Sequence, residues 1–363
     1  MLRVALLGYY GFNNFGDEAV LFSIIKLLRQ EIDDIKFTVL SHDPPQTAAS
    51  YEVETANRWS LKEIYGALKK SDSLILGGGS LLQDVTGKKS LAYYLGVVKL
   101  ALLLKKPVIF YAQGLGPLQS SLSRFLVARI SQKAALISVR DEASAELFKE
   151  IGVLNKKIYL TADPVFGLEP SRFKSSSSAK WEKANRTPTR PMLAFSLRAW
   201  GKKDDYIQDM ANVADDLAHQ GWDIVFCPFH YPADFIFAEK IAQLMKSSPL
   251  IFKQPLSLEE MISVVADFQL MVGMRFHALA LAGLNRVPFL GISYDPKVEA
   301  LCSLLGQPLL GRVEDVRHGD LNDAIANALK EEKNLKENLE QNLPRLQAKA
   351  KFNALLVKQL LFS

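Results

Sequence analysis

The sequence predicts an α/β protein made of two Rossmann-like domains that face each other across a cleft. A chain of 363 residues is long for one hydrophobic core, because cores stop growing at roughly 250–300 residues. Short apolar runs alternate with helical patterns along most of its length, which is typical of parallel sheets built from βαβ units. A polar segment rich in serine and proline, residues 166–191, interrupts this alternation. We therefore expect one domain on either side of that segment.

The first domain is predicted over residues 1–165. Each expected strand leads through a polar or glycine-rich loop into a helix. Ser60 and Glu63 have the spacing of a capping box, which marks the start of one of these helices. The predicted strands are residues 2–8, 35–41, 73–76, 107–112, 135–139 and 157–160.

The second domain is predicted over residues 192–330, after a linker or surface loop at 166–191. Ser257 and Glu260 form another capping-box pattern. Residues 331–363 read as a C-terminal helix, charged on one side and apolar on the other, which could pack on either domain. The predicted strands are residues 192–197, 222–227, 249–252, 268–272 and 287–292.

Composition narrows the class of protein. Charged residues make up 23% of the chain and the net charge is +5, which suits an anionic ligand or an anionic membrane surface. There is no Lys/Arg-rich block of the kind that binds nucleic acid. Cys227 and Cys302 lie in apolar patterns and read as buried thiols. The longest apolar run, 91–104, is shorter than the ~20 residues of a membrane-spanning helix. We expect a cytoplasmic protein, with peripheral contact at the inner face of the plasma membrane left open.

The loop after the first strand, Gly8–Asp17, is longer than an ordinary βα turn of about 2–6 residues. It matches neither a dinucleotide fingerprint nor a phosphate-binding P-loop. The side chains of Asn13, Asn14 and Asp17 can hydrogen-bond sugar hydroxyls, and the rings of Tyr9, Tyr10 and Phe12 offer faces for stacking. The structural alternative is a tight turn in which Asp17 caps the helix.

A second glycine-rich loop, Gly77–Asp84, follows another strand. Gly78 and Gly79 would let a ligand approach the backbone closely, and Asp84 could read a hydroxyl or act as a base. The alternative is a plain strand-to-helix turn.

Cationic groups follow several predicted strands. Arg140 and Arg198 each stand where a strand ends, and for Arg140 a surface salt bridge is the alternative interpretation. Arg275 and His277 come directly after the strand at 268–272, at a helix N-terminus that favours anions. Lys297 begins a helix, where a cation is unfavourable unless it faces an anion. His230 is a weaker candidate at another strand end, and no spacing of His, Cys and Asp suggests a metal site.

The ordered set of these motifs resembles the polysaccharide pyruvyl transferases, of the CsaB type. The resemblance spans residues 1–300 and is weakest in the serine-rich linker and the C-terminal helix. The segments that carry it are Gly8–Glu18, Gly77–Ser80, Gln113–Pro117, Val139–Asp141, Ala162–Pro164, Gly273–Ala278 and Ser293–Lys297.

The resemblance implies a fold similar to that of GT-B glycosyltransferases, without sugar-nucleotide chemistry. It implies transfer of the enolpyruvyl carbons of phosphoenolpyruvate to a sugar as a cyclic ketal, with release of phosphate. The sugar that the resemblance implies is N-acetylmannosamine in a lipid-linked cell-wall or surface polysaccharide precursor. Arg275, His277 and Lys297 match donor-site positions of the family, and Arg140 and Arg198 match less closely.

The chemistry of the donor agrees with this set of residues. Phosphoenolpyruvate carries a phosphate and a carboxylate, both of which Arg and Lys side chains bind. We expect His277 to act as general acid, with Arg198, Arg275 and Lys297 neutralising the donor. The scheme requires no cofactor, and the oligomeric state stays open. The alternatives are a GT-B glycosyltransferase or sugar-nucleotide epimerase, and a non-catalytic sugar- or anion-binding protein.

Overall fold

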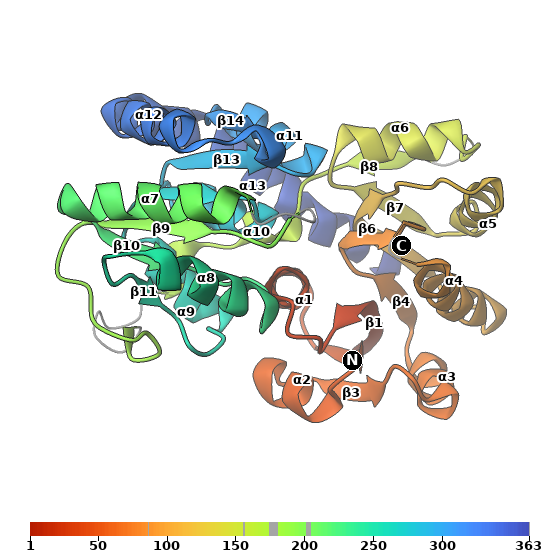
Figure 1. The fold of residues 1–363 in the computed structure, drawn as a ribbon. Coiled ribbons are helices and arrows are strands. Elements are labelled where there is room, and N and C mark those ends of the chain that lie inside the picture. The colour runs from red at the N-terminus through yellow and green to blue at the C-terminus, as the bar shows by residue number, and fades with distance from the viewer. Residues whose placement is uncertain (86, 155–156, 174–180, 201–204, 363) are drawn as a thin grey trace. The chain divides into compact units, whose positions relative to one another are not determined.

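The computed structural model describes residues 1–85, 87–154, 157–173, 181–200 and 205–362. The chain forms two compact units, one of residues 1–168 and 345–363 and the other of residues 169–344. Each unit contains one parallel β-sheet with helices packed against it (Figure 1). The predicted α/β class with two Rossmann-like units is therefore confirmed.

The sheet of the first unit has its longest strands near its centre. Its order is β3-β2-β1-β4-β6-β7-β8, and β5 pairs with β6 beside this path. All of its pairings are parallel. The strands are β1 (Leu2–Tyr10), β2 (Ile35–Ser41), β3 (Glu54–Asn57), β4 (Ser73–Leu76), β5 (Gly79–Leu82), β6 (Val108–Leu115), β7 (Leu136–Val139) and β8 (Ile158–Leu160).

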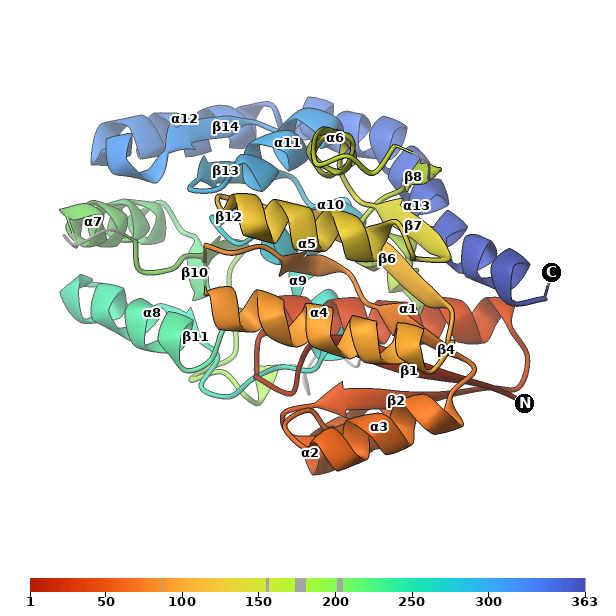
Figure 2. The same cartoon turned by 90° about the vertical axis from the view of Figure 1, so that its right-hand side faces the viewer.

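The helices of the first unit pack on both faces of this sheet. Figure 2 shows α4 running along the strands, and its apolar residues share a core with β4, β6 and α3. Helix α1 packs against β1 and β2. The elements are α1 (Phe15–Glu31), α2 (Pro44–Tyr51), α3 (Leu61–Lys70), α4 (Lys88–Leu103), α5 (Ser121–Ser131), α6 (Glu142–Glu150) and the 3-10 turn η1 (Pro164–Gly167).

The sheet of the second unit has the order β11-β10-β9-β12-β13-β14 and is also parallel. Its strands are short, and those from β9 to β13 are almost wholly apolar and buried, as expected for strands covered on both faces, whereas the edge strand β14 is partly exposed. They are β9 (Met192–Ser196), β10 (Asp223–Phe226), β11 (Leu250–Ile251), β12 (Phe268–Gly273), β13 (Phe289–Ser293) and β14 (Leu309–Arg312).

Alternate residues of β12 point to opposite faces of this sheet. Leu270 and Val272 join a core formed with α7 and α12, whereas Gly273 lies against Leu279 of α10. The helices and 3-10 turns of this unit are η2 (Pro170–Phe173), α7 (Asp205–His219), α8 (Ala233–Leu244), α9 (Leu258–Val265), α10 (Phe276–Leu284), α11 (Pro296–Leu305), η4 (Val313–Asp315) and α12 (His318–Lys330).

The last helix, α13 (Glu332–Phe362), contributes to both units. Up to Pro344 it belongs to the second unit, where the Asn338 side chain donates to the carbonyl of Gly306 at 3.0 Å. From Arg345 onward it belongs to the first unit, where Asn353 is buried and its Oδ1 accepts from the Ser138 hydroxyl at 2.6 Å. The polar core contact of Asn353 fixes the register of this part of the helix.

Four elements depart from the sequence prediction. The strands β3 and β14 and the helix α2 were not predicted, and the glycine run after β4 forms a short strand, β5, rather than only a turn. The strand β3 is polar and half-exposed, so it lacks the apolar run by which the other strands are recognised. The predicted linker at 166–191 contains the end of η1 and the whole of η2, and residues 174–180 lie outside the described part.

None of the described helices combines the length and apolarity that crossing a membrane requires. Within the described ranges, the acidic, histidine and cysteine side chains form no group of three or more that could hold a metal ion. Both cysteines are buried thiols, as predicted.

Each sheet has one topological switch point, where successive connections leave in opposite directions. In the first unit it lies between β1 and β4, and in the second between β9 and β12. Ligands of open α/β sheets bind beyond the carboxyl ends of the strands at such points. The loops after these four strands are therefore the places to look for a site.

Candidate active site

Arg275 follows β12 at the switch point of the second unit. It is the N-cap residue of α10, and its guanidinium is paired with the carboxylate of Asp234. Arg275 Nε donates to Asp234 Oδ2 at 2.9 Å, and Nη2 donates to Oδ1. The Asp234 side chain is 2% exposed and also accepts from the backbone N–H groups of Phe229 and His230. The pair therefore ties the loop after β10 to the loop after β12.

Arg198 follows β9, on the other side of the same switch point. Its guanidinium carbon lies 4.9 Å from the centre of the Tyr294 ring and 5.7 Å from that of Trp200. Its Nε is buried without a hydrogen-bond partner. The two rings are themselves 5.1 Å apart, so the guanidinium packs beside an aromatic pair, which favours a cation and restricts its orientation. Arg198 is thus held as an oriented cation at the end of β9, and its binding of an anion stays a prediction.

His230 is brought to the same edge. Burial is the main cause that lowers its pKa, and the positive charges of Arg275 and Arg198 lower it further, while Asp234 opposes the shift. The imidazole of His230 is therefore neutral near pH 7. Its electrostatic coupling to both arginines indicates that these three groups share one region of the second unit.

His277 and Lys297 stand in the first turns of their helices. His277 is the second residue of α10 and is half-buried, with its ring at an edge-to-face angle to Phe276. Lys297 is the second residue of α11, and its Nζ lies 3.8 Å from Oδ2 of Asp295, the N-cap residue. This carboxylate offsets the unfavourable position of the lysine, so its place needs no external anion to explain it.

In the first unit, the loop after β1 is anchored by its own side chains. Asn14, rather than Asp17, is the N-cap of α1, and its Oδ1 accepts from the N–H of Gly16 at 3.2 Å. Glu18 accepts from the N–H of Gly11 at 2.7 Å and from the hydroxyl of Tyr51 at 2.6 Å. Asn13 is exposed and has a left-handed backbone with φ of 57°. The loop is thus held in one conformation by these hydrogen bonds, and Asn13 points to the surface.

Asp17 lies in the first turn of α1, close to Gly79, the first residue of β5. A Cβ placed on Gly79 would lie 3.3 Å from Asp17 Oδ1, and the φ of Gly79 is +105°. Burial and the negative charge of Glu18 raise the pKa of Asp17 to about 7, against the opposing effect of Arg140. Asp17 can therefore gain or lose a proton near neutral pH.

Glycines near the ends of β1 and β4 leave space for neighbouring side chains. The ring of Tyr10 packs where a Cβ on Gly8 or Gly77 would stand, and this side chain is fully buried. Its ring has no face for a sugar, contrary to the stacking role that we considered for it. Gly78 lies against Val20 of α1 and is buried as well.

Asp84 has a structural task. Its carboxylate accepts from the N–H groups of Gln119 at 2.8 Å and Ser120 at 2.9 Å. The bond from Gln119 is the main cause that holds its pKa below the ordinary value. This carboxylate is a weak base, so the suggested role of Asp84 in proton abstraction is not supported by its surroundings.

Arg140 is not a free surface cation. Its Nη1 lies 2.5 Å from Oδ2 of Asp163, and the two side chains are 8% and 2% exposed. Nη2 donates to the Ser80 hydroxyl at 3.4 Å. The structure therefore replaces the surface salt bridge that we considered with a buried ion pair, and a further contact of Arg140 with an anion stays a prediction.

An aromatic cluster around Arg58 was missed by the sequence analysis. The guanidinium of Arg58, a residue that is 3% exposed, donates to the carbonyl of Gly8 at 2.8 Å and to the Tyr94 hydroxyl at 3.4 Å. Its guanidinium carbon lies 4.6–5.9 Å from the centres of five aromatic rings. They belong to Tyr9, Phe12, Trp59, Tyr93 and Tyr94.

The outer part of this cluster is an aromatic wall made of Tyr9, Phe12, His42 and Trp59. The rings of Tyr9 and Phe12 stack at 4.1 Å, and those of Phe12 and His42 at 4.3 Å. Trp59 is 61% exposed and donates its indole N–H to His42 Nδ1 at 2.9 Å. In the sequence, this cluster could have been suspected from Arg58 and Trp59, which stand directly after a strand end. The strand, β3, is polar and was not predicted, so these two residues were not considered.

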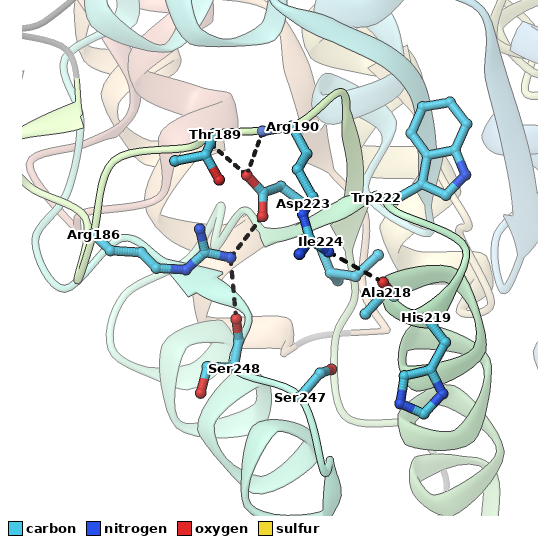
Figure 3. Close-up of a pocket in the computed structure, with 10 residues that line it drawn as sticks. All are labelled: Arg186, Thr189, Arg190, Ala218, His219, Trp222, Asp223, Ile224, Ser247 and Ser248. Carbon is cyan, nitrogen blue, oxygen red and sulfur yellow. Dashed lines mark hydrogen bonds and ion pairs between the residues drawn. The ribbon is translucent and has the colours of Figure 1, made fainter.

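A cavity of about 390 Å³ lies elsewhere in the second unit (Figure 3). It is at the opposite edge of the sheet, because Asp223 is the first residue of β10. The Asp223 carboxylate is occupied by Arg186 at 2.8 Å and by the N–H groups of Thr189 and Arg190. The polar groups that line this cavity already bind one another, and the cavity is not part of the candidate site.

Comparison with known proteins identifies the family. Residues 14–296 match the family model described as polysaccharide pyruvyl transferase. Among curated proteins, the chain is similar to the amylovoran biosynthesis protein AmsJ of Erwinia amylovora, with 21% identity over 370 residues, which cover 85% of this chain and 87% of the relative.

Solved structures resemble the fold. The UDP-GlcNAc 2-epimerase of Neisseria meningitidis bound to UDP-GlcNAc has a TM-score of 0.67 and 13% identity, with full coverage of both chains. Anabaena Alr3699/HepE in complex with UDP and glucose has a TM-score of 0.63 and 11% identity, covering 99% of this chain and 98% of that one. At such low identity these likenesses show a shared GT-B-like fold alone. With the family match over most of its length, the chain belongs to the polysaccharide pyruvyl transferases, enzymes that pyruvylate polysaccharides.

Proposed function

We propose that this enzyme moves the enolpyruvyl group of phosphoenolpyruvate onto a sugar of a polysaccharide precursor, forming a cyclic ketal and releasing phosphate. The observation that carries the proposal is the pair Arg198 and Arg275, two oriented guanidinium groups after β9 and β12 at the switch point of the second unit. Oriented guanidinium groups bind the oxygens of phosphate and carboxylate by paired N–H donors. Phosphoenolpyruvate presents both anions on three carbon atoms.

The remaining residues of the second unit have roles in this scheme. Lys297 adds a point charge for the phosphate, and His277 is the proposed general acid that gives a proton to C3 of the donor. The neutral imidazole of His230 would accept or donate a hydrogen bond beside the two arginines. Arg140 remains a weaker candidate for a donor contact, because Asp163 already pairs with it.

The proposed reaction balances without a cofactor. Protonation of C3 uses the electrons of the C2–C3 double bond, and a sugar hydroxyl then bonds to C2. The bond between C2 and the bridging phosphate oxygen breaks, and its electrons leave with the phosphate. A second hydroxyl of the same sugar then bonds to C2 and closes the ring. One hydroxyl proton replaces the proton placed on C3, and the other leaves as part of hydrogen phosphate. Positive charges that face the phosphate and carboxylate lower the barrier to these steps.

We assign the acceptor to the first unit. Asn13, Asn14 and Asp17 offer hydrogen bonds around the loop after β1, and the exposed aromatic wall offers faces on which the apolar side of a sugar can stack. Gly78, Gly79, Tyr10 and Asp84 would support this site by shaping its loops. By resemblance, the proposed acceptor is N-acetylmannosamine in a lipid-linked cell-wall or surface polysaccharide precursor, met at the inner face of the plasma membrane.

The proposal is tested by incubating the purified enzyme with phosphoenolpyruvate and an arylated N-acetylmannosamine disaccharide, and measuring phosphate. We expect release that depends on both substrates, and no consumption of UDP-GlcNAc. Release at the level of a protein-free control would refute phosphoenolpyruvate as donor for this acceptor. Turnover of UDP-GlcNAc instead would favour the epimerase reaction that the similar fold performs in other proteins.

A further inference from the structure

Asp17 occupies the switch point of the first sheet. The loop after β1 leads into α1, which carries Asp17, and a Cβ on Gly79, the first residue of β5, would lie 3.3 Å from Asp17 Oδ1. Open α/β sheets bind ligands beyond the carboxyl ends of the two strands whose connections leave in opposite directions. Asp17 is therefore an acidic side chain at the place where such sheets bind ligands.

The carboxylate of Asp17 differs from those of its acidic neighbours in its hydrogen bonds and ion pairs. Among the hydrogen bonds and ion pairs of the described residues, none involves its side chain, which is partly buried. Glu18, next to it, is bound by Gly11 and Tyr51, and Asp163 is paired with Arg140. The Asp17 oxygens are not among the described side-chain atoms that are buried without a partner, so they keep some exposed surface. The Asp17 carboxylate can therefore accept a hydrogen bond from a ligand.

The charges around Asp17 come from its neighbour on α1 and from three other parts of the first unit. Glu18 on α1 and Asp163 before η1 disfavour its ionisation, whereas Arg140 after β7 and Arg58 after β3 favour it. Burial raises the pKa of Tyr9 and Tyr10 on β1, and the charge of Asp17 raises both further. Together with burial, these groups set the pKa of Asp17 to about 7, where a carboxylate can both take up and return a proton.

We propose that Asp17 is the general base that removes the proton from the acceptor hydroxyl as that hydroxyl attacks C2 of the donor. This inference rests on the proposed function and adds a catalytic residue to it. The O–H bond breaks, its proton moves to Asp17 Oδ, and the oxygen lone pair forms the new bond to C2. Asp17 then returns the proton to solvent before the next turnover.

The test compares Asp17→Asn with Asp33→Asn, which removes the same charge at an exposed position of the same unit. Phosphate release from phosphoenolpyruvate is followed from pH 5.5 to 8.5 at saturating N-acetylmannosamine disaccharide. For the wild type and Asp33→Asn we expect kcat to fall below a pH near 7. For Asp17→Asn we expect kcat to be lower by about 10²–10⁴, without that acidic limb, and a KM for phosphoenolpyruvate within about twofold of wild type.

A variant that kept the wild-type kcat, or kept the acidic limb, would overturn the role of Asp17. So would a melting temperature at pH 8 well below that of the wild type, because it would show a structural role instead. These outcomes differ from failure of the proposed function, in which the wild type itself releases no phosphate. The folded state of each variant is checked by circular dichroism before the kinetic comparison.

Discussion

Asp234 and Arg275 form a side-on pair in which the carboxylate binds the Nε and Nη2 edge of the guanidinium. The same carboxylate accepts the backbone N–H groups of Phe229 and His230. One buried acid thus fixes both an arginine and the loop that carries His230. Arg275 keeps Nη1 on its other edge, and we propose that this edge serves the donor.

The substitution Asp234→Asn should raise the KM for phosphoenolpyruvate about 10–100-fold, because hydrogen bonds to charged groups are worth roughly 1.5–3 kcal/mol. The amide would also place an N–H against the N–H groups of Arg275. The KM for the sugar acceptor should stay unchanged, which a general loss of folding would not produce. Asp216→Asn, which alters a half-exposed pair with His318, is the control. Equal changes in both KM values would argue against a positioning role.

The substitution His277→Gln should lower kcat by about 10²–10⁴ and leave the KM for phosphoenolpyruvate nearly unchanged, as expected when a general acid is lost. His219→Gln is the control, because His219 is exposed and lines the cavity at the opposite edge of the sheet. Initial rates of phosphate release measure both variants. A His277→Gln enzyme as fast as the control would remove this imidazole from the mechanism.

The substitution Trp59→Ala should raise the KM for the acceptor about 3–10-fold, since an aromatic stacking contact is worth about 1 kcal/mol. Trp59 is 61% exposed, so little stability should be lost. Tyr65→Ala removes another exposed ring from the same unit and serves as control. The KM for phosphoenolpyruvate should not change in either variant. An unaltered acceptor KM in Trp59→Ala would exclude the aromatic wall from sugar binding.

The pKa of Asp17 also predicts how stability depends on pH. Its folded-state pKa of about 7 lies above the ordinary value of 3.8, so the folded state binds the proton more tightly than the unfolded state. The free energy of unfolding therefore falls as pH rises from about 4 to 7. Asp17→Asn removes this penalty and should melt about 2–4 °C above the wild type at pH 8, with a smaller gain at pH 5. Calorimetry at the two pH values measures it, and an equal gain at both would contradict the shifted pKa.

Much of the fold could be predicted because its strands are short apolar runs bounded by glycine and polar residues. The strand β12 and the arginine that follows it are visible in this way. The strand β3 was missed because only one of its four residues is buried, and with it the arginine and tryptophan at its end.

The sequence allowed the positions of the candidate site residues at strand ends to be predicted. It did not allow the contacts that these residues make to be predicted. Asp141 caps α6 and accepts from the N–H of Ser144 at 2.7 Å; such a cap can be read from the sequence, because it depends on neighbours in the chain. The partners of Arg140 and Arg275 are 23 and 41 positions away. A local sequence pattern cannot identify partners so far away in the chain. These partners nevertheless determine whether the charge of an arginine is already paired.

The measurement that tests the central claim most directly is ¹³C NMR of the product formed from phosphoenolpyruvate labelled at C2. The account predicts that the label moves to the sugar as a saturated carbon bonded to two sugar oxygens and a methyl group, with one phosphate released per product. A labelled carbon that stays part of a vinyl ether, or label that never reaches the sugar, would contradict ketal formation from phosphoenolpyruvate.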